Sequence, residues 1–476
     1  MESATKKPPH FVLFPWTGTI SHIIPMTDLG CLLASHGADV TIITTPVNAA
    51  IARGRVDRAP APHRAAITVT AIPFPAADAG LPEGCERMDL LRSQPEIALF
   101  FAANKGCIIS GMCQTWALGL ARELGVPCYV FHGFGAFALL CMEYLFKHRP
   151  HEAVASPDEP FDVPALPPFR CRLTRRQLPP HFLPPTSVGG KALQGIREFD
   201  VAADGFVVNT FEELERGSTA LLAEATEKKV IAVGSVALCR APSLDPQSMP
   251  SDASRCMAWL DGKQPRSVVY VSFGSGGKLP PAQLMQLGMA LVSCPAPVLW
   301  IIKGADALPD DVKEWLRENA DADGVAGSKC LVVRGWAPQV AILDHPAVGG
   351  FMTHCGWGST LEAVAASVPM ATWPFFVDQF MNEQLIVDVL GIGVSVGVTK
   401  PVETALTASG DAGGSEVEAE VGMEKVKEAL EMLMDQGPKG EERWKKAQEL
   451  KLKAKGALEK GGSSYINLEN LVQSFA

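Results

Sequence analysis

Residues Trp336–Gln384 read WAPQVAILDHPAVGGFMTHCGWGSTLEAVAASVPMATWPFFVDQFMNEQ. This stretch holds three Trp, two His, a glycine-rich run and a closing Asp-Gln pair between apolar segments. That is more polar and aromatic chemistry than a packed core requires. The stretch therefore predicts a binding pocket, with groups suited to an aromatic base, a ribose, two phosphates and a sugar.

Local patterns divide the stretch into a strand, a turn and a helix. The apolar run Val348–Met352 predicts the strand, Thr353–Thr360 the turn, and Leu361–Ala366 the start of the helix. In open α/β sheets, ligands bind beyond the carboxyl ends of the strands. A helix that begins there presents free N–H groups and the positive end of its dipole to anions. We therefore expect a pyrophosphate at this helix start, held without a metal ion.

Outward from this stretch, apolar runs alternate with helical patterns, which predicts two α/β units with parallel sheets covered by helices. Helices are expected over Ile23–Ser35, from Phe211 onward, over 280–292 and over Met423–Lys460. Strands are expected at His10–Trp16, Asp39–Thr44, Ala66–Ile72, Gly106–Ser110, Cys128–His132 and Phe206–Asn209 in the first unit, and at Ser267–Phe273, Val298–Ile302, Cys330–Arg334 and Gly393–Val396 in the second.

Three further segments are irregular in sequence. The tract Pro160–Pro185 predicts a surface loop, because Pro cannot donate to a strand ladder or sit inside a helix. The polar stretch Ala241–Ser254 predicts an interdomain linker. The tract Thr399–Val417 is poor in large apolar residues and rich in Gly, and it predicts a mobile loop.

Composition excludes several classes of protein. A chain of 476 residues, 47% apolar and 20% charged, is expected to form two globular domains. The formal charge of −10 argues against nucleic acid as a partner. No apolar run is long enough for a signal peptide or a membrane span, so we expect a cytoplasmic protein. The twelve scattered Cys have no metal-ligand spacing, so buried free thiols are expected, and no metal site.

The opening stretch resembles, over nearly its whole length, the donor-binding signature of plant UDP-sugar-dependent glycosyltransferases. The segments PMTDLGCLLASHGADVTIITTPVNAA and GFVVNTFEELE resemble the branch that acts on flavonoids, terpenoids and related compounds. The resemblance implies the GT-B fold, in which two Rossmann-like α/β domains with parallel sheets face each other across a cleft. It implies an acceptor-binding domain at 1–240, a linker at 241–255, a UDP-sugar-binding domain at 256–455, and a C-terminal helix at 456–476 that returns to the first domain.

The resemblance also assigns roles in holding the nucleoside of the donor. Trp336 would stack on the uracil ring, and the backbone of Ala337 would hydrogen-bond to it. Gln339 would lie near the ribose, and Glu362 would accept hydrogen bonds from both ribose hydroxyls. UDP-glucose is thus expected as the co-substrate, with no separate cofactor.

Phosphates and sugar are assigned in the same way. His354 and Ser359 would bind phosphate oxygens, and Ser275 would contact the second phosphate. Gly358 replaces a common phosphate-contacting Asn, a form that also occurs in active relatives. The closing Gln of the signature implies glucose rather than galactose. The sugar hydroxyls would be held by Trp357, Asp378 and Gln379.

The catalytic base is expected at His22, in PWTGTISHIIPMTDL. Inverting transfer needs a group that takes the proton of the acceptor hydroxyl, and His suits that task near neutral pH. The family has its His just after the first strand and before a Pro. Here Ser21 replaces the usual Gly, and the spacing from Pro15 is one residue longer. The other interpretation is a first-turn helix His that faces solvent.

The acid that normally orients this His is missing. Where the family has Asp after the fourth strand, this chain has Gly111, and Gly135 stands where a Ser or Thr near the sugar is usual. Three explanations are open. His22 works alone on acidic acceptors such as phenols; another group takes over, for which Gly111 leaves room; or the protein binds nucleotide sugars or small molecules with little ordinary transfer.

The acceptor is expected in the first domain, between His22, the loop after Leu81, and Phe134 and Phe137, whose rings suit a flat or greasy aglycone. The protein is expected to act as a monomer on a small aromatic or terpenoid metabolite. A nicotinamide-dependent oxidoreductase is the competing class of enzyme. It needs a GxGxxG turn after the first strand, which PWTGTISH lacks.

Overall fold

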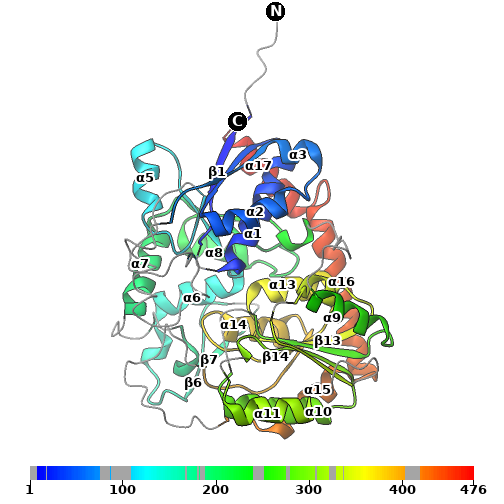
Figure 1. Ribbon diagram of the computed structural model, residues 1–476. Helices are drawn as coiled ribbons and strands as arrows, with labels where there is room; N and C mark the ends of the chain where they lie inside the picture. Colours follow the sequence, from blue (N-terminus) through cyan, green and yellow to red (C-terminus); the bar gives the residue numbers. More distant parts are fainter. Residues whose placement is uncertain are drawn as a thin grey trace, which may run out of the picture.

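The computed structural model describes residues 8–17, 19–74, 86, 109–166, 169–179, 182, 188–239, 251–274, 279–305, 308–320, 329–335, 337–402 and 419–475. Its strands form two parallel sheets of seven and six strands, each covered by helices on both faces. We call the unit built on the seven-stranded sheet the first domain and the other the second domain (Figure 1).

The first domain's sheet has the order β3-β2-β1-β4-β5-β8-β9, and each printed pair in it is parallel. Its strands are β1 (His10–Phe14), β2 (Asp39–Thr44), β3 (Ile67–Ala71), β4 (Ile109–Gly111), β5 (Tyr129–His132), β8 (Gly205–Val208) and β9 (Lys229–Ala232). Its helices are α1 (Ile20–Ser35), α2 (Pro46–Val56), α3 (Ala61–Ala65), α5 (Ala117–Leu124), α6 (Ala136–His148), α7 (Val188–Ala202) and α8 (Ser218–Thr226), with 3₁₀ turns η2 (Pro150–Glu152), η3 (Arg175–Gln177) and η5 (Val236–Cys239).

The second domain's sheet has the order β12-β11-β10-β13-β14-β15 and is also parallel. Its strands are β10 (Val268–Ser272), β11 (Val298–Ile301), β12 (Cys330–Val333), β13 (Val348–Thr353), β14 (Met370–Thr372) and β15 (Gly393–Ser395). Its helices are α9 (Ser251–Asp261), α10 (Pro281–Ser293), α11 (Asp310–Asn319), α12 (Gln339–Leu343), α13 (Trp357–Ala366), α14 (Gln379–Gln384), the π-helical η7 (Leu385–Val389) and α15 (Met423–Leu433).

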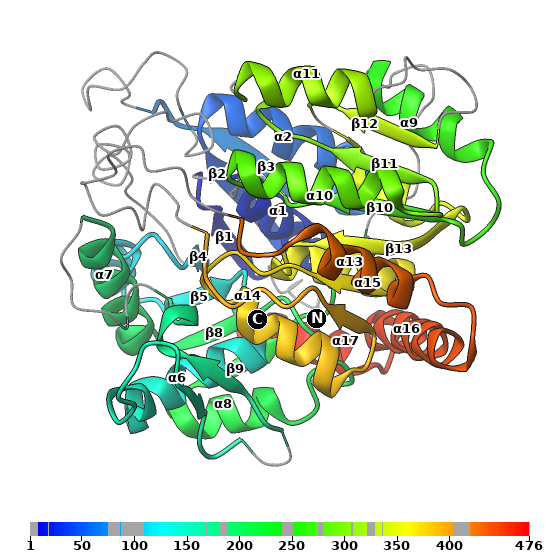
Figure 2. The ribbon, with the colours of Figure 1, turned by 90° about the horizontal axis from the view of Figure 1, so that it is seen from below.

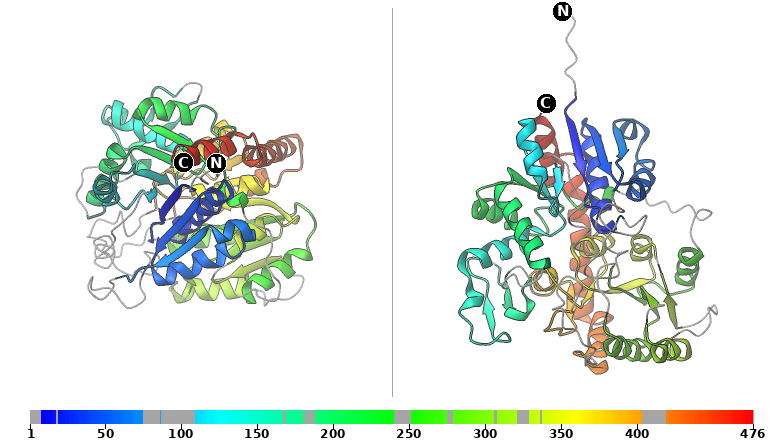
Figure 3. Two further views of the ribbon diagram at one scale, coloured as in Figure 1. Left: turned by 90° about the horizontal axis from the view of Figure 1, so that it is seen from above. Right: turned by 60° about the vertical axis from the view of Figure 1, so that its left-hand side comes forward.

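Two long helices join the domains. Helix α16 (Pro438–Leu458) packs on α13, and α17 (Ser463–Gln473) packs on β9 and α1 of the first domain. Leu468, Leu471 and Val472 of α17 are buried in the apolar cluster under the first sheet. Figure 3 (right) shows this end of the chain, drawn orange to red, running from the second domain to the first.

The helical layers place α13 between the domains. Helices α10, α11 and α15 lie on the side of the second sheet away from the first domain, and Figure 2 shows α10 and α11 from that side. Helix α13 lies on the opposite side and contacts η5 of the first domain. The largest cluster of buried apolar side chains contains residues of both domains, so the core continues across their interface.

Two predictions about the first domain are wrong. The helix expected from Phe211 begins at Ser218 instead, because Gly217 has a left-handed φ of +79° that a continuing helix does not allow. The tract expected to be a surface loop contains an antiparallel hairpin of β6 (Pro160–Asp162) and β7 (Arg172–Thr174). Its paired side chains Phe161 and Leu173 are buried in the core, and this burial outweighs the surrounding Pro residues.

Within the ranges given above, no helix is both long and apolar enough to cross a bilayer. Residues 241–250 of the expected linker and 403–418 of the expected mobile loop lie outside the described residues.

Candidate active site

The site lies where the carboxyl ends of both sheets meet. In the second domain, β13 ends at Thr353, and the HCGW turn leads directly into α13. In the first domain, β4 ends at Gly111, and the turns after β1 and β5 carry Trp16 and Gly133. Parallel strands bring these turns to one edge of each sheet, as ligand-binding α/β proteins require.

The imidazole of His354 is enclosed between two glycines. A Cβ on Gly274, at the end of β10, would lie 2.6 Å from its Cε1 atom, and a Cβ on Gly356 would collide with its Nε2 atom. Glycine at both positions is therefore what allows the ring to lie at the start of α13. The buried Nδ1 atom has no hydrogen-bond partner among the described residues. Burial, and then the charge of Lys303, lowers the pKa of His354 to about 4, so the ring is neutral near pH 7.

A hydrogen-bonded cluster of four side chains lies beside this turn. The Gln339 amide donates to Ser359 Oγ over 3.0 Å and to Glu362 Oε2 over 2.8 Å. The hydroxyl of Tyr270, on β10, donates to Gln339 Oε1 over 3.3 Å. The structure thus joins three of the predicted donor-binding residues into one network, which fixes the Glu362 carboxylate near the first turns of α13.

Trp357 opens α13 and crosses the domain interface. Its indole Nε1 donates to the backbone carbonyl of Asn209, just after β8, over 2.8 Å. Its ring lies where a side chain at Gly135 would be, since a Cβ there would approach it to 2.9 Å and Glu215 Oε2 to 2.8 Å. The indole N–H of Trp357 is therefore already hydrogen-bonded to the first domain.

Glu215 supports the first-domain side of this contact. Its carboxylate accepts from the backbone N–H of Ala136 over 3.0 Å and of Phe137 over 2.6 Å, at the start of α6. It also accepts from the hydroxyl of Thr210. Burial raises the pKa of Glu215 to about 7 despite these donors. Glu215 thus fixes the beginning of α6 against the turn that contains Gly135.

Asp378 and Gln379 are both buried in a strained turn. Gln379 Oε1 accepts from the backbone N–H groups of Phe375 and Phe376, and Asp378 Oδ2 accepts from the Asn382 amide over 2.7 Å. Burial raises the pKa of Asp378 to about 7. Val377, just before the pair, has a φ of +58°, which is costly for a β-branched residue. Such strain is common where a loop must hold side chains for a ligand.

His22 lies in the first turn of α1 and faces the turn after β5. Its ring meets that of Trp16 edge to face at 4.8 Å, and a Cβ on Gly133 would lie 3.4 Å from its Cε1 atom. Burial, and then the charge of His132, lowers the pKa of His22 to about 4. Within the described part of the chain, its side chain has no hydrogen-bond or ion-pair partner. The ring is thus neutral and ready to accept a proton, but no carboxylate orients it there.

Gly111, where the acid was expected, packs closely against Trp16. A Cβ at this position would lie 3.1 Å from the backbone N and 3.2 Å from the Cβ of Trp16. The Gln114 amide, whose Oε1 would be 3.6 Å from that Cβ, donates to the carbonyl of Pro15 over 3.3 Å. A side chain at Gly111 would therefore require Trp16 to shift by a few tenths of an ångström.

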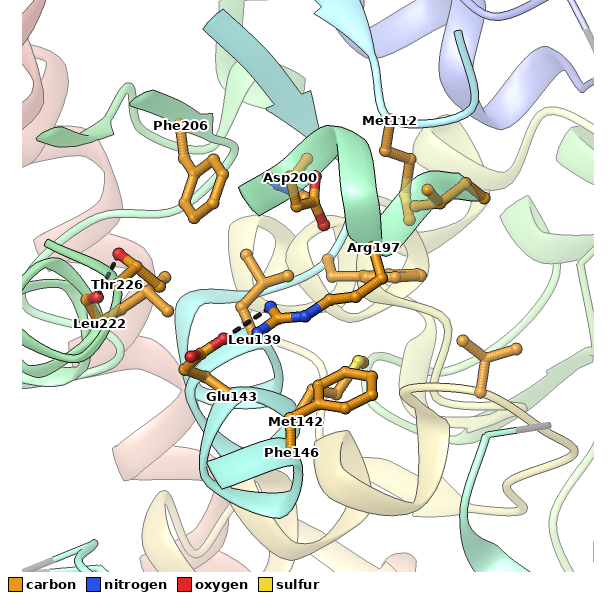
Figure 4. A pocket seen from close by; sticks show the side chains of 14 residues that line it. Met112, Leu139, Met142, Glu143, Phe146, Arg197, Asp200, Phe206, Leu222 and Thr226 are labelled. Carbon is orange, nitrogen blue, oxygen red and sulfur yellow. Dashed lines mark hydrogen bonds and ion pairs between the residues drawn. The ribbon is translucent and has the colours of Figure 1, made fainter. Parts of the chain in front are cut away.

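The two predicted acceptor-pocket residues have different surroundings. Phe134 lines a cavity of the first domain, shown in Figure 4, together with residues of α6, α7 and β8. Phe137 is fully buried, and its ring packs edge to face on Phe169 at 5.8 Å. A side chain so placed supports the cavity wall rather than contacting a ligand directly.

Comparisons with known proteins agree with this geometry. A family model described as "UDP-glucoronosyl and UDP-glucosyl transferase" matches residues 249–408. UDP-glycosyltransferase 73C6 of Arabidopsis thaliana is 38% identical over 490 residues, which cover 98% of this chain and 96% of that protein. The chain belongs to the plant UDP-glycosyltransferase family. UDP-glycosyltransferase 73E1 of Stevia rebaudiana is also 38% identical, over 98% of this chain and 96% of its own length.

Solved structures of plant UDP-glycosyltransferases share the fold. UGT73P12 of Glycyrrhiza uralensis, solved with glycyrrhetinic acid 3-O-monoglucuronide, matches with a TM-score of 0.84 at 31% identity, over 98% of this chain and 96% of that chain. UGT2 of Phytolacca americana, at 24% identity and a TM-score of 0.71, covers 98% of this chain and 99% of its own, and supports the fold alone. The two domains therefore form the GT-B fold, and the family transfers glycosyl groups from UDP-sugars to small metabolites.

Several predicted site residues of this UDP-glycosyltransferase are not placed by the structure. Trp336, Ser275 and, apart from Glu86, the loop after Leu81 lie outside the described residues. Ala337 is half-buried against the core, and its carbonyl accepts from the backbone N–H of Gln339. Gly358 is exposed, with open space where a side chain would be.

Sequence reasoning missed the buried ionisable groups behind the site. Glu215 contacts the turn at Gly135, His132 lowers the pKa of His22, and Asp200 pairs with His132. None of these three residues stands in a motif whose spacing indicates a role. Glu215 lies within GFVVNTFEELE, so the resemblance pointed to its segment but not to its contacts. Lys303 follows β11 as an ordinary basic residue, and only the fold brings its charge near His354.

Proposed function

We propose that this protein transfers glucose, with inversion, from UDP-glucose to a hydroxyl group of a small aromatic or terpenoid metabolite. The observation that carries the proposal is the juxtaposition of His354 with the Gln339–Ser359–Glu362 network at the start of α13. The unpartnered Nδ1 atom of His354 suits a phosphate oxygen, and the helix start adds free N–H groups and the positive end of its dipole. The carboxylate of Glu362 suits the two ribose hydroxyls.

The remaining donor contacts follow from the family relationship. Trp336 and Ala337 would hold the uracil, Ser275 and Ser359 the phosphates, and Asp378 and Gln379 the glucose hydroxyls. The indole N–H of Trp357 already binds Asn209, so its side chain would shape the sugar site rather than donate to it. Glucose is the proposed sugar because the signature closes with Gln.

His22 would act as the general base. In the reaction, the acceptor oxygen bonds to the anomeric carbon and its proton passes to His22. The bond from that carbon to the phosphate oxygen breaks, and UDP leaves with the electron pair. A base with a pKa of about 4 is weak. Acidic phenols, which give up a proton readily, therefore suit it better than aliphatic alcohols.

The test is product formation from UDP-glucose and a panel of phenols and terpenoid alcohols. We expect β-glucosides, with phenols the faster acceptors. His22→Ala should lower kcat by about 10²–10⁴-fold, the usual contribution of a positioned base. Calorimetry should show unchanged UDP binding by this variant.

His10→Ala is the matched control, because His10 opens β1 and bonds to Thr41 Oγ1 at an exposed position. It should leave turnover unchanged. An unaltered rate in His22→Ala would overturn the mechanism. UDP-glucose binding without transfer to any acceptor would instead favour a repurposed binding protein, in keeping with the missing acid at Gly111.

A further inference from the structure

The imidazole of His22 is oriented by packing alone among the described residues, because no carboxylate there pairs with it. The torsion that joins Cβ to an imidazole ring is soft, so a ring without a hydrogen bond can rotate. A neutral imidazole carries one N–H and one lone pair, and only the lone pair can take the proton of an acceptor hydroxyl. If His22 is the base, its neighbours must therefore restrict the rotation of its ring.

The indole of Trp16 is one of these neighbours. The centroids of the Trp16 and His22 rings are 4.8 Å apart and the two planes are perpendicular, a favourable arrangement for an aromatic pair. The ring also meets the backbone of Gly133, where a Cβ would lie 3.4 Å from Cε1 and 3.7 Å from Nδ1 of His22. An indole and a backbone turn thus limit how far the imidazole can rotate.

Trp16 is in turn held by the end of β4. The buried Gln114 side chain donates through Nε2 to the carbonyl of Pro15, directly before Trp16, over 3.3 Å. The buried Ser110 hydroxyl donates to Gln114 Oε1, also over 3.3 Å. The backbone of Gly111 lies so near that a Cβ there would be 3.1 Å from Trp16 N. Trp16 itself is only 7% exposed. These contacts fix the turn from which the indole projects.

The end of β4 is also where an acid partner of the base was expected. Strands β1 and β4 are neighbours in the sheet, and Figure 2 shows them side by side. In a catalytic triad, the acid holds the imidazole in one orientation and one tautomer. Gly111 has no side chain that could do so, but its backbone packs on the residue that meets the ring. The end of β4 therefore acts on His22 through an indole.

We propose that Trp16, held by Gln114, is the positioning residue of the base and takes over the orienting role of the missing acid. An indole can orient the imidazole and keep water from it, but it cannot neutralise the charge that develops when His22 takes up a proton. The base is then well oriented but weak, which favours acidic hydroxyls such as those of phenols. This inference rests on the proposed function, because it takes His22 as the base.

Trp16→Ala tests the orienting role through kinetics. With a phenol as acceptor, kcat at pH 8 should fall about 10–100-fold, since a misaligned catalytic group loses much of its contribution. The KM for UDP-glucose should change little, because the proposed donor contacts come from the second domain. Trp16→Phe retains an aromatic ring beside His22, and it should retain most of the wild-type kcat.

The protonation of His22 is a readout that a general loss of stability would not change. Burial, and then the charge of His132 at the end of β5, lowers the pKa of His22 to about 4. Asp200 of α7 lies 3.4 Å from His132, and both groups remain in the variants, while Trp16 and Gln114 carry no charge. Hydration of the ring in Trp16→Ala should raise the pKa of His22 toward 6.5. The acid limb of the kcat/KM profile and the NMR titration of the ring should both move to higher pH. In Trp16→Phe they should stay near the wild-type position.

Two further variants assign the effect. Gln114→Leu removes the donor to the Pro15 carbonyl but keeps an apolar side chain in its place, and it should shift kcat and the acid limb in the same direction by a smaller amount. Trp116→Leu is the matched control, because its indole packs edge to face on Phe14 at 5.9 Å, at the same end of the sheet. It should lower stability and leave the pKa of His22 unchanged.

The outcomes separate this inference from the proposed function. Glucosylation by the wild type, with kcat and the acid limb unchanged in Trp16→Ala, would overturn the inference and leave the proposed function standing. A raised pKa of His22 in Trp16→Ala but not in Trp116→Leu, with no glucoside formed by the wild type, would support the hold of Trp16 on the ring and contradict the proposed function. If Trp16→Ala does not fold, Gln114→Leu decides, and wild-type values of kcat and of the acid limb in that variant would overturn the inference.

Discussion

The indole of Trp357 donates to the carbonyl of Asn209 across the domain interface, over 2.8 Å. Asn209 follows β8 of the first domain, and Trp357 is the first residue of α13. One hydrogen bond therefore ties the helix that carries the donor-site network to the domain that carries His22. This contact helps to fix the position of α13 relative to the base.

Trp357→Phe should weaken the domain interface. The ring is largely retained but its N–H is lost, which leaves the Asn209 carbonyl unpaired at a cost of about 1–3 kcal/mol. We expect a lower free energy of unfolding in denaturant titrations and a lower kcat/KM for both substrates. Trp300→Phe, in β11 within the second-domain core, should lower stability with much less effect on kcat/KM. Equal kinetic effects in the two variants would contradict the role of the contact.

Gly135→Ser would introduce the type of side chain that the family resemblance leads us to expect here, but into occupied space. Its Cβ would lie within 2.9 Å of the Trp357 ring and 2.8 Å of Glu215 Oε2. We expect a loss of about 1–3 kcal/mol in unfolding free energy from overpacking. Gly358→Ala is the control, because a Cβ there meets open space, and it should be near neutral. A Gly135→Ser protein as stable as wild type would show that the interface adapts.

Gly111→Asp should not restore a functional acid. The Cβ would lie 3.1 Å from the Trp16 backbone, so either Trp16 or the end of β4 must shift. We expect Gly111→Asp and Gly111→Ala to lose similar stability, about 1–3 kcal/mol, since the cause is steric. Calorimetric melting and phenol glucosylation would be measured for both. A rise in kcat specific to Gly111→Asp would contradict this expectation. It would show that Trp16 moves aside and that the missing acid limits the rate.

The protonation of His22 should occur at unusually low pH. Burial lowers its pKa from 6.5 to about 4, and the charge of His132 acts in the same direction. In an NMR titration, the His22 ring should titrate near pH 4, with its signal identified by its loss in His22→Ala. His132→Phe should raise the pKa of His22. A His22 midpoint near 6.5 would mean that the ring is solvated.

The lowered pKa of His22 also makes the free energy of unfolding depend on pH. The unfolded chain takes up a proton at His22 near pH 6.5, whereas the folded chain does so only near pH 4. Because the unfolded state then binds more protons, this group lowers the free energy of unfolding as the pH falls between those two values. His22→Ala should reduce that dependence.

Glu362→Ala should act on the donor and not on the acceptor. Its carboxylate is fixed by the Gln339 amide at 2.8 Å and is proposed to accept from both ribose hydroxyls. Hydrogen bonds to charged groups contribute about 1.5–3 kcal/mol, so we expect a 10–100-fold rise in Kd for UDP. Calorimetry with UDP and KM values for both substrates provide the measurement. Glu441→Ala, at the exposed ion pair with Arg266, is the control and should leave UDP binding unchanged.

Much of the fold was predictable because it rests on local patterns. Strands such as Asp39–Thr44 and Val298–Ile301 were placed to within a residue, since an apolar run between turns marks a buried parallel strand. The start of α8 was misplaced because Glu215 turns inward to bond the first residues of α6, which local propensity does not express.

The sequence by itself determined the family, the two-domain α/β architecture and the residues proposed for the donor. Each depends on residue types at fixed short spacings. Only the tertiary structure decided that Trp16 packs beside Gly111, that Trp357 binds Asn209, and that His132 lies 3.4 Å from Asp200. These partners lie 68 to 148 residues apart or in different domains, as with His132 and Asp200 or Asn209 and Trp357. Their contacts are set by how sheets and helices pack, and no short-range sequence pattern indicates a contact between residues so far apart in the chain.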